Sequence, residues 1–211
     1  MIVLTVDSLT KHFDADPILD GVTFDVRAGQ RIGLVGPNGA GKTTLLNILS
    51  GQADADGGRV QWSSQARFGY VRQQSGFPVV RSVWEEAEDA LAESIELSKE
   101  SERLAKMISE TADHSERRDL EARFDSLQEE LTRRNAYHLD HQIERVLTGL
   151  GFMPDTFQQS VHELSGGQQN RLLLAKLLLA APDVLLLDEP SNHLDIEGTT
   201  WLEDFLCNSR Q

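Results

Sequence analysis

Residues 36–44 read Gly-Pro-Asn-Gly-Ala-Gly-Lys-Thr-Thr, and this stretch decides the fold around it. The spacing is that of G-x-x-x-x-G-K-[ST], in which backbone N–H groups turn inward around phosphate. An apolar run at 32–35 precedes it and favours a strand, and another at 45–49 follows it and favours a helix. Strand, loop and helix in this order predict a phosphate-binding loop. The alternative is a glycine-rich turn that binds nothing, which would leave Lys42 and both threonines without a role.

Two side chains of the loop have a direct chemical role. The Lys42 ammonium supplies positive charge for the β- and γ-phosphates of a nucleotide, and the Thr43 hydroxyl suits Mg²⁺. Gly36, Gly39 and Gly41 give the backbone its freedom to turn. The following helix begins with unpaired N–H groups and the positive end of its dipole, which both favour an anion.

Composition limits the other possibilities. A chain of 211 residues is enough for one large domain or one domain with an insert. The net charge of −14 disfavours indiscriminate binding to nucleic acid or anionic membranes, without excluding a local basic patch. Cys207 is the only cysteine, so no internal disulfide forms, which fits the cytosol. The longest apolar run, 172–181, contains Lys176 and is too short to span a bilayer. The N-terminus lacks the features of a signal peptide.

The front of the chain predicts a small, mostly antiparallel sheet joined to the phosphate loop. Alternating or β-rich patterns favour strands at 1–6, 22–26, 59–62 and 67–71. Between the first two strands, 10–17 is expected to be a turn-rich loop that exposes Phe13.

From Ser82 the pattern changes to long helices. Apolar residues recur every three or four positions as far as Ile108, which predicts one long amphipathic helix. Asp113 with Glu116 has capping-box spacing and starts a second helix. Leucine seams on both helices predict an antiparallel hairpin whose arms of about 20 residues reach ~30 Å. Residues 82–134 contain sixteen acidic and eight basic residues, most simply a solvated surface. A further helix is expected over 140–150.

The second half of the chain holds two more motifs. Ser165 and Gln168 have capping-box spacing, so a helix should begin here and run through Leu179. With two glycines at its start this is either a second anion cradle or a simple helix cap. Residues 183–187 favour a buried parallel strand ending in two acids. Asp188 is placed to hold Mg²⁺, and Glu189 to orient and deprotonate a water. The alternative is a strand end that happens to be acidic.

Taken together, the motifs resemble the nucleotide-binding domain of ATP-binding cassette (ABC) proteins over the whole chain. Residues 36–44 are similar to its Walker A loop, 164–168 match its LSGGQ signature, and 183–189 are similar to Walker B. The resemblance implies ATP and Mg²⁺ as ligands. The implied ATP-binding residues are Phe13, which would stack on adenine, and Gly36, Asn38, Gly39, Gly41, Lys42, Thr43 and Thr44.

The resemblance also assigns the remaining roles. The implied catalytic residues are Glu189, Lys42 and the Q-loop glutamine Gln73, and the implied metal site is formed by Thr43, Gln73 and Asp188. Asp195 belongs to the D-loop. The signature residues that would hold the ATP of an opposite cassette are Ser165, Gly166, Gly167 and Gln168.

The implied fold class is α/β. A phosphate-loop core of residues 1–75 and 158–211 would carry an N-terminal antiparallel β-subdomain. An inserted helical subdomain, 76–157, would contain an arm hairpin at about 83–134.

Residues 190–197, Pro-Ser-Asn-His-Leu-Asp-Ile-Glu, and the arm are similar to the F subfamily, whose members act on ribosomes. The resemblance implies a cytoplasmic ATPase that works with a second cassette and reaches the ribosome, rRNA or tRNA through its arm. The family's switch histidine, the strand that carries it and a second cassette have no match here. We therefore expect this chain to resemble the front portion of a longer protein and to be nearly inactive alone.

Two other functions stay open. One is the ATPase subunit of an ABC transporter, and the other is an ATP-dependent interaction switch with little turnover. GTP chemistry is disfavoured because the sequence has no Asn-Lys-x-Asp motif for guanine.

Overall fold

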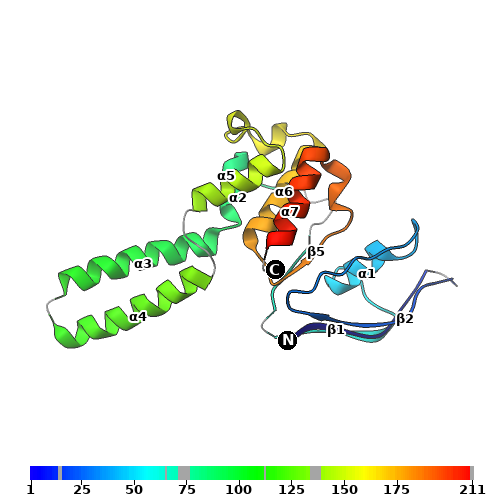
Figure 1. The fold of residues 1–211 in the computed structure, drawn as a ribbon, viewed down its shortest axis with the longest axis horizontal. Helices are drawn as coiled ribbons and strands as arrows, with labels where there is room; N and C mark the ends of the chain where they lie inside the picture. Colours follow the sequence, from blue (N-terminus) through cyan, green and yellow to red (C-terminus); the bar gives the residue numbers. More distant parts are fainter. Residues whose placement is uncertain (14–15, 65, 71–76, 112, 134–138, 210–211) are drawn as a thin grey trace.

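The computed structural model describes residues 1–13, 16–64, 66–70, 77–111, 113–133 and 139–209. Figure 1 shows an N-terminal sheet with one helix, a block of helices, and a helical hairpin that projects away from both. The fold is of the mixed α/β class. Its strands are β1 (Ile2–Phe13), β2 (Asp16–Arg27), β3 (Gly57–Trp62), β4 (Phe68–Tyr70) and β5 (Val184–Leu186). Its α-helices are α1 (Lys42–Leu49), α2 (Val83–Asp89), α3 (Ala92–Glu110), α4 (His114–Arg133), α5 (Leu139–Gly149), α6 (Gly166–Ala180) and α7 (Ile196–Asn208). Three short 3₁₀ turns are η1 (Pro154–Thr156), η2 (Val161–Glu163) and η3 (Pro190–His193).

The N-terminal sheet is antiparallel, in the order β2-β1-β3. The inward side chains of β1, including Leu4, Val6 and Leu9, are buried with the apolar face of α1. The expected loop at 10–17 is wrong, because β1 and β2 stay paired as far as Phe13 and Asp16. The Asp56 carboxylate supports this end of β1, since it accepts hydrogen bonds from His12 N at 2.7 Å and Lys11 Nζ at 2.8 Å. The Lys11 hydrogen bond lowers the pKa of Asp56.

A second, smaller sheet joins two distant parts of the chain. β4 pairs in parallel with β5, with Phe68 opposite Val184 and Tyr70 opposite Leu186. The expected parallel strand at 183–187 is therefore confirmed. The expectation that 67–71 belongs with the front antiparallel sheet is wrong. Two bonds at Arg67 lead into the pairing: its N–H donates to the side-chain Oδ2 of Asp183 at 2.8 Å, and its carbonyl accepts from Val184 N at 3.1 Å.

The strand expected at 32–35 does not form. These residues have no regular secondary structure, and Ile32, Leu34 and Val35 are 46%, 40% and 97% exposed. A strand needs a neighbour that accepts and donates its backbone hydrogen bonds. No strand among the described residues pairs with this segment in either sheet. The apolar run thus indicates strand propensity, while pairing decides whether a strand exists.

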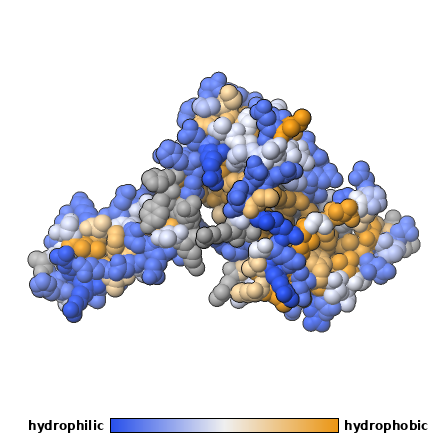
Figure 2. All heavy atoms as spheres, viewed as in Figure 1, coloured by the Kyte–Doolittle hydropathy of each residue, from blue (hydrophilic) through white to orange (hydrophobic). Residues whose placement is uncertain are grey.

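The helical hairpin consists of α3 and α4, which lie antiparallel and project from the molecule (Figure 1). Leu104, Leu120 and Leu131 are buried in its seam. The hydroxyl of Ser101, also buried there, accepts a 2.6 Å hydrogen bond from Gln128 Nε2. The surface of this arm is mainly hydrophilic (Figure 2). These contacts make the arm a unit with its own small core, separate from the main one.

The bounds of the arm differ in part from expectation. The single helix expected from 83 to 108 is two helices, because the chain breaks between α2 and α3 at Ala90 and Leu91. The expected cap at Asp113 is present, since its carboxylate accepts from Ser115 N at 2.7 Å and Glu116 N at 3.1 Å. These two hydrogen bonds lower the pKa of Asp113.

The main helical core is formed by α2, α5, α6 and α7, around fully buried side chains such as Val83, Leu147 and Leu172. Gly149 is needed at the end of α5, because a Cβ there would lie 2.0 Å from the Trp201 ring of α7. Across the described residues, no helix is both long and apolar enough to cross a membrane.

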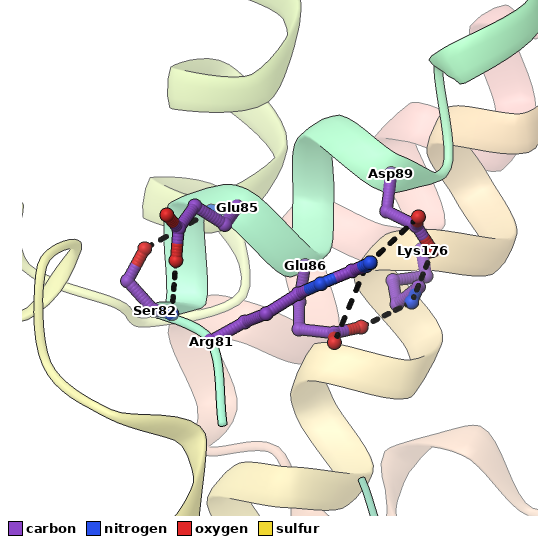
Figure 3. A network of polar contacts seen from close by, with 6 residues as sticks. All are labelled: Arg81, Ser82, Glu85, Glu86, Asp89 and Lys176. Carbon is purple, nitrogen blue, oxygen red and sulfur yellow. Dashed lines mark hydrogen bonds and ion pairs between the residues drawn. The ribbon is translucent and has the colours of Figure 1, made fainter. Parts of the chain in front are cut away.

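Two cations and two acids connect α2 to α6 (Figure 3). Lys176 of α6 contacts the carboxylate of Glu86, which is only 4% exposed, and lies 3.2 Å from Asp89. Arg81 Nη1 lies 2.8 Å from Asp89 and 3.8 Å from Glu86. The Arg81 hydrogen bond lowers the pKa of Asp89, and the same bond raises the pKa of Arg81. The two positive charges of this network equal its two negative charges. Each of the two acids contacts both cations.

We expect Glu86→Ala to lower the free energy of unfolding by about 2 kcal/mol, because it leaves the partly buried Lys176 with a single, more exposed acid. Urea unfolding followed by circular dichroism measures this. Glu88→Ala is the matched control, since Glu88 is an exposed acid on the same helix. An equal loss in both variants would show that the network contributes nothing specific.

Candidate functional site

The phosphate loop has the backbone that its glycines predict. Gly39 and Gly41 have φ of 84° and 86°, a region that side-chain-bearing residues rarely adopt. A Cβ on Gly41 would also lie 2.7 Å from Ile18 Cγ2 of β2. Gly41 precedes α1, whose N-terminus is not capped by any side chain of the described residues. The first N–H groups of α1 are therefore available to an anion.

The Lys42 ammonium points back into this loop. Its Nζ donates to the carbonyl oxygens of Gly36 at 3.0 Å and Pro37 at 3.2 Å. Asn38 and Thr43 are exposed on the same segment, and Thr44 is half-buried on the first turn of α1. The Lys42 ammonium, the Thr43 hydroxyl and the free N–H groups at the start of α1 thus belong to one short segment.

Asp188 and Glu189 follow β5 at its carboxyl end. Asp188 Oδ2 is buried and has no hydrogen-bond partner among the described residues. Glu189 turns the chain sharply, with φ of 46°, and its Oε2 accepts a 2.7 Å hydrogen bond from Asn192 Nδ2. Burial, with a smaller contribution from the charge of Asp188, raises the pKa of Tyr70 at the end of β4.

One groove brings the lysine and the two acids together. It has a volume of about 380 Å³ and is lined by Lys42 of α1 and by Asp188 and Glu189 after β5. Its other walls are mainly apolar, and Figure 2 shows hydrophobic side chains gathered on this side of the molecule. Arg31 lies at this groove and joins its two sides, since its Nη2 donates to the carbonyls of Leu206 and Cys207 at the end of α7.

The unpartnered oxygen of Asp188 and the hydroxyl of Thr43 are the hard oxygen ligands that Mg²⁺ prefers. No group of three or more His, Cys, Asp or Glu side chains that could hold a metal occurs in the described part of the chain. A magnesium ion here would therefore need nucleotide oxygens and water to complete its shell, as is usual at phosphate-loop sites.

The signature segment is folded as its capping-box spacing predicts. Ser165 caps α6, with its hydroxyl accepting from Gln168 N at 3.3 Å and its N–H donating to Gln168 Oε1 at 2.9 Å. Gly166 and Gly167 form the first turn of α6. None of these four residues lines the groove that holds Lys42.

The other candidate residues are more scattered. Phe13 is 59% exposed at the end of β1. Gln73 lies outside the described residues. Asp195 caps α7, because its Oδ1 accepts from Gly198 N at 2.8 Å.

Sequence reasoning missed the contacts of three polar residues. Asn192 bonds Glu189, and Asn170 of α6 lies 2.8 Å from the Nε2 atom of His193. These residues follow or flank motifs, but nothing in their spacing predicts the pairing.

A glycine-rich turn before a helix, with Lys42 lining one groove together with two acids that follow a parallel strand, is the arrangement of a phosphate-loop nucleotide-binding domain. The sequence profile described as ABC transporter matches residues 19–192, and the chain belongs to this family.

Three known proteins illustrate the similarity. The chain is 36% identical over 206 residues to ABC transporter F family member 5 of Arabidopsis thaliana, with 95% of this chain and 29% of that protein covered. It is 35% identical over 207 residues to the energy-dependent translational throttle protein EttA of Mycobacterium tuberculosis, with 98% and 36% covered. A solved ATP-binding subunit of an ABC transporter superposes with a TM-score of 0.66 at 16% identity, covering 99% of this chain and 75% of that one. The chain spans about a third of the length of these two curated relatives.

We expect Lys42→Ala to weaken ATP binding by on the order of a hundredfold, because a charged hydrogen-bond donor to phosphate is lost. Isothermal titration calorimetry measures the dissociation constant for ATP. Lys106→Ala, on the exposed arm, is the control. Unchanged affinity in Lys42→Ala would refute the assignment of the phosphate loop.

Proposed function

We propose that this chain is an ATP-hydrolysing module of an F-subfamily ABC protein that acts in the cytoplasm on the ribosome, in regulation or protection of translation. The observation that supports the chemistry is the groove that Lys42, Asp188 and Glu189 line together. The relatives support the biological role, since they include F-family members and a protein named as a translational throttle.

The reaction is attack of water on the γ-phosphorus of ATP, in line with the bond to the leaving oxygen of ADP. The Glu189 carboxylate accepts a proton of the attacking water, and Gln73 helps to orient that water. Lys42 and the loop N–H groups stabilise the negative charge of the phosphates, and Phe13 stacks on the adenine. Mg²⁺, held by Thr43, Asp188 and Gln73, adds charge neutralisation when bound. The products are ADP and inorganic phosphate.

The position of the signature supports a two-cassette mechanism. Residues 165–168 do not line the groove of Lys42, so they are free to meet the ATP of a second cassette, present in the same protein or supplied by dimerisation. Asp195, the N-cap of α7, would belong to the D-loop that meets the second cassette. One cassette forms only half of each site, so we infer that these 211 residues alone turn over little ATP.

The helical arm is the proposed contact with the ribosome, rRNA or tRNA. It projects from the molecule and carries no residue of the nucleotide groove (Figure 1). The second candidate is the ATPase subunit of a transporter, which is favoured by solved neighbours described as parts of ABC transporters. An interaction switch with little turnover is a third candidate.

We expect Glu189→Gln in the full-length native protein to keep ATP affinity and to lower phosphate release by on the order of 10²–10⁴-fold, because the amide keeps the shape but loses the base. Steady-state phosphate release and nucleotide binding are measured together. Glu203→Gln, an exposed acid of α7, is the control. Near-normal release would show that Glu189 is not the base and would favour another mechanism.

Replacing the distal half of the arm, residues 103–121, by a short Gly-Ser loop should leave ATP binding unchanged and abolish ATP-dependent co-sedimentation with ribosomes. The reason is that the arm carries no groove residue. The unmodified protein is first tested for co-sedimentation with ribosomes, with and without ATP, as the reference for the arm variant. No association in either condition would refute the ribosomal role and favour the transporter reading.

A further inference from the structure

Asn192 makes two hydrogen bonds to Glu189, one to its carboxylate and one to its main-chain carbonyl. Its side-chain Nδ2 donates to Glu189 Oε2 at 2.7 Å, and its backbone N donates to the Glu189 carbonyl at 3.1 Å. The two residues are the N-cap and the third residue of η3, so the turn itself sets the distance between them. Among the described residues, the hydrogen bond from Asn192 is given to Oε2 of this carboxylate.

The short helix η3, which carries Asn192, contacts α6. His193 Nε2 lies 2.8 Å from Asn170 Nδ2, and a Cβ on Gly167 would lie 4.0 Å from His193 Nδ1. The imidazole therefore lies over the first turn of α6, next to the capped signature. The amide of Asn170 donates to Nε2 when that ring nitrogen is unprotonated.

The same residues enclose a small pocket. Asn170, Asp188, Glu189, Asn192 and His193 all contribute to its lining, and its volume is about 50 Å³. A space of this size holds a few water molecules when its walls are polar. Glu189 thus lines both this pocket and the groove of Lys42.

We propose that Asn192 is a positioning residue for Glu189, and that the Asn170–His193 contact keeps the Asn192 turn in place on α6. Asn192 fixes the orientation of the base toward the attacking water, and α6 supports that orientation from the signature side. The inference rests on the proposed role of Glu189. It assigns to η3 a function in orienting the base, in addition to its place in the loop toward a second cassette.

The test measures ATP turnover by the full-length native protein. We expect Asn192→Ala to lower kcat on the order of tenfold at unchanged KM, since one hydrogen bond to a charged group is lost. Asn192→Asp should give at least the same loss, because it keeps the size and replaces the donor by a second negative charge. Asn170→Ala should lower kcat severalfold. Asn208→Ala, which removes an exposed amide at the end of α7, is the matched control and should leave both constants unchanged.

A double variant separates positioning from general damage. In a Glu189→Gln background, Asn192→Ala should cause no further loss, because residues that act through one group are not additive. A further loss in that background, a kcat unchanged or raised by Asn192→Ala, or a change in KM alone would overturn the inference. Normal turnover by Glu189→Gln itself would remove the proposed base, and this inference with it. If Glu189→Gln lowers kcat but Asn192→Ala and Asn192→Asp leave it unchanged, the positioning role of Asn192 is refuted and the role of Glu189 as base stands.

Discussion

The parallel pairing of β4 with β5 is the contact on which the site depends. The two strands are separated by more than a hundred residues, including the whole arm, and three register pairs bring them together. This pairing places the end of β5 next to Tyr70 and α1, because Tyr70 also donates to the Asn47 side chain at 3.0 Å. Without it, Asp188 and Glu189 would have no fixed position relative to Lys42. The helices α2 to α6 thus lie in the sequence between two strands that pair with each other.

Local chemistry was predictable wherever a short-range pattern decides the structure. The caps at Asp113 and Ser165 follow from their spacing, because each N-cap needs only a residue two or three positions away. The positive φ of Gly39 and Gly41 follows from the loop motif in the same way. The parallel strand at β5 was also predictable from its continuous apolar run, although only Leu186 of its three residues is buried.

The errors share a physical cause, which is that pairing and packing over long distances leave no local pattern. The run at 32–35 has strand propensity but no neighbouring strand in the described part of the chain. The segment at 67–71 pairs with β5 because of bonds to Asp183 and Val184, which no local pattern reveals. The helix from 83 to 108 breaks at Ala90 and Leu91, although the apolar spacing continues across the break. The domain boundaries and the roles of the site residues stay predictions, because arrangement alone does not measure activity.

The backbone of Glu189 shows how the site combines strain with support. A left-handed conformation at a residue with a side chain costs about 1–2 kcal/mol. Glu189 adopts it three residues after the end of β5 and begins η3, whose His193 contacts Asn170 of α6. The two bonds from Asn192 offset part of that cost, and they act on the residue that carries the candidate base. The residue in this left-handed turn also lines both the groove of Lys42 and the pocket beside α6. The cost of the turn is therefore accepted at the residue where the two spaces share a wall.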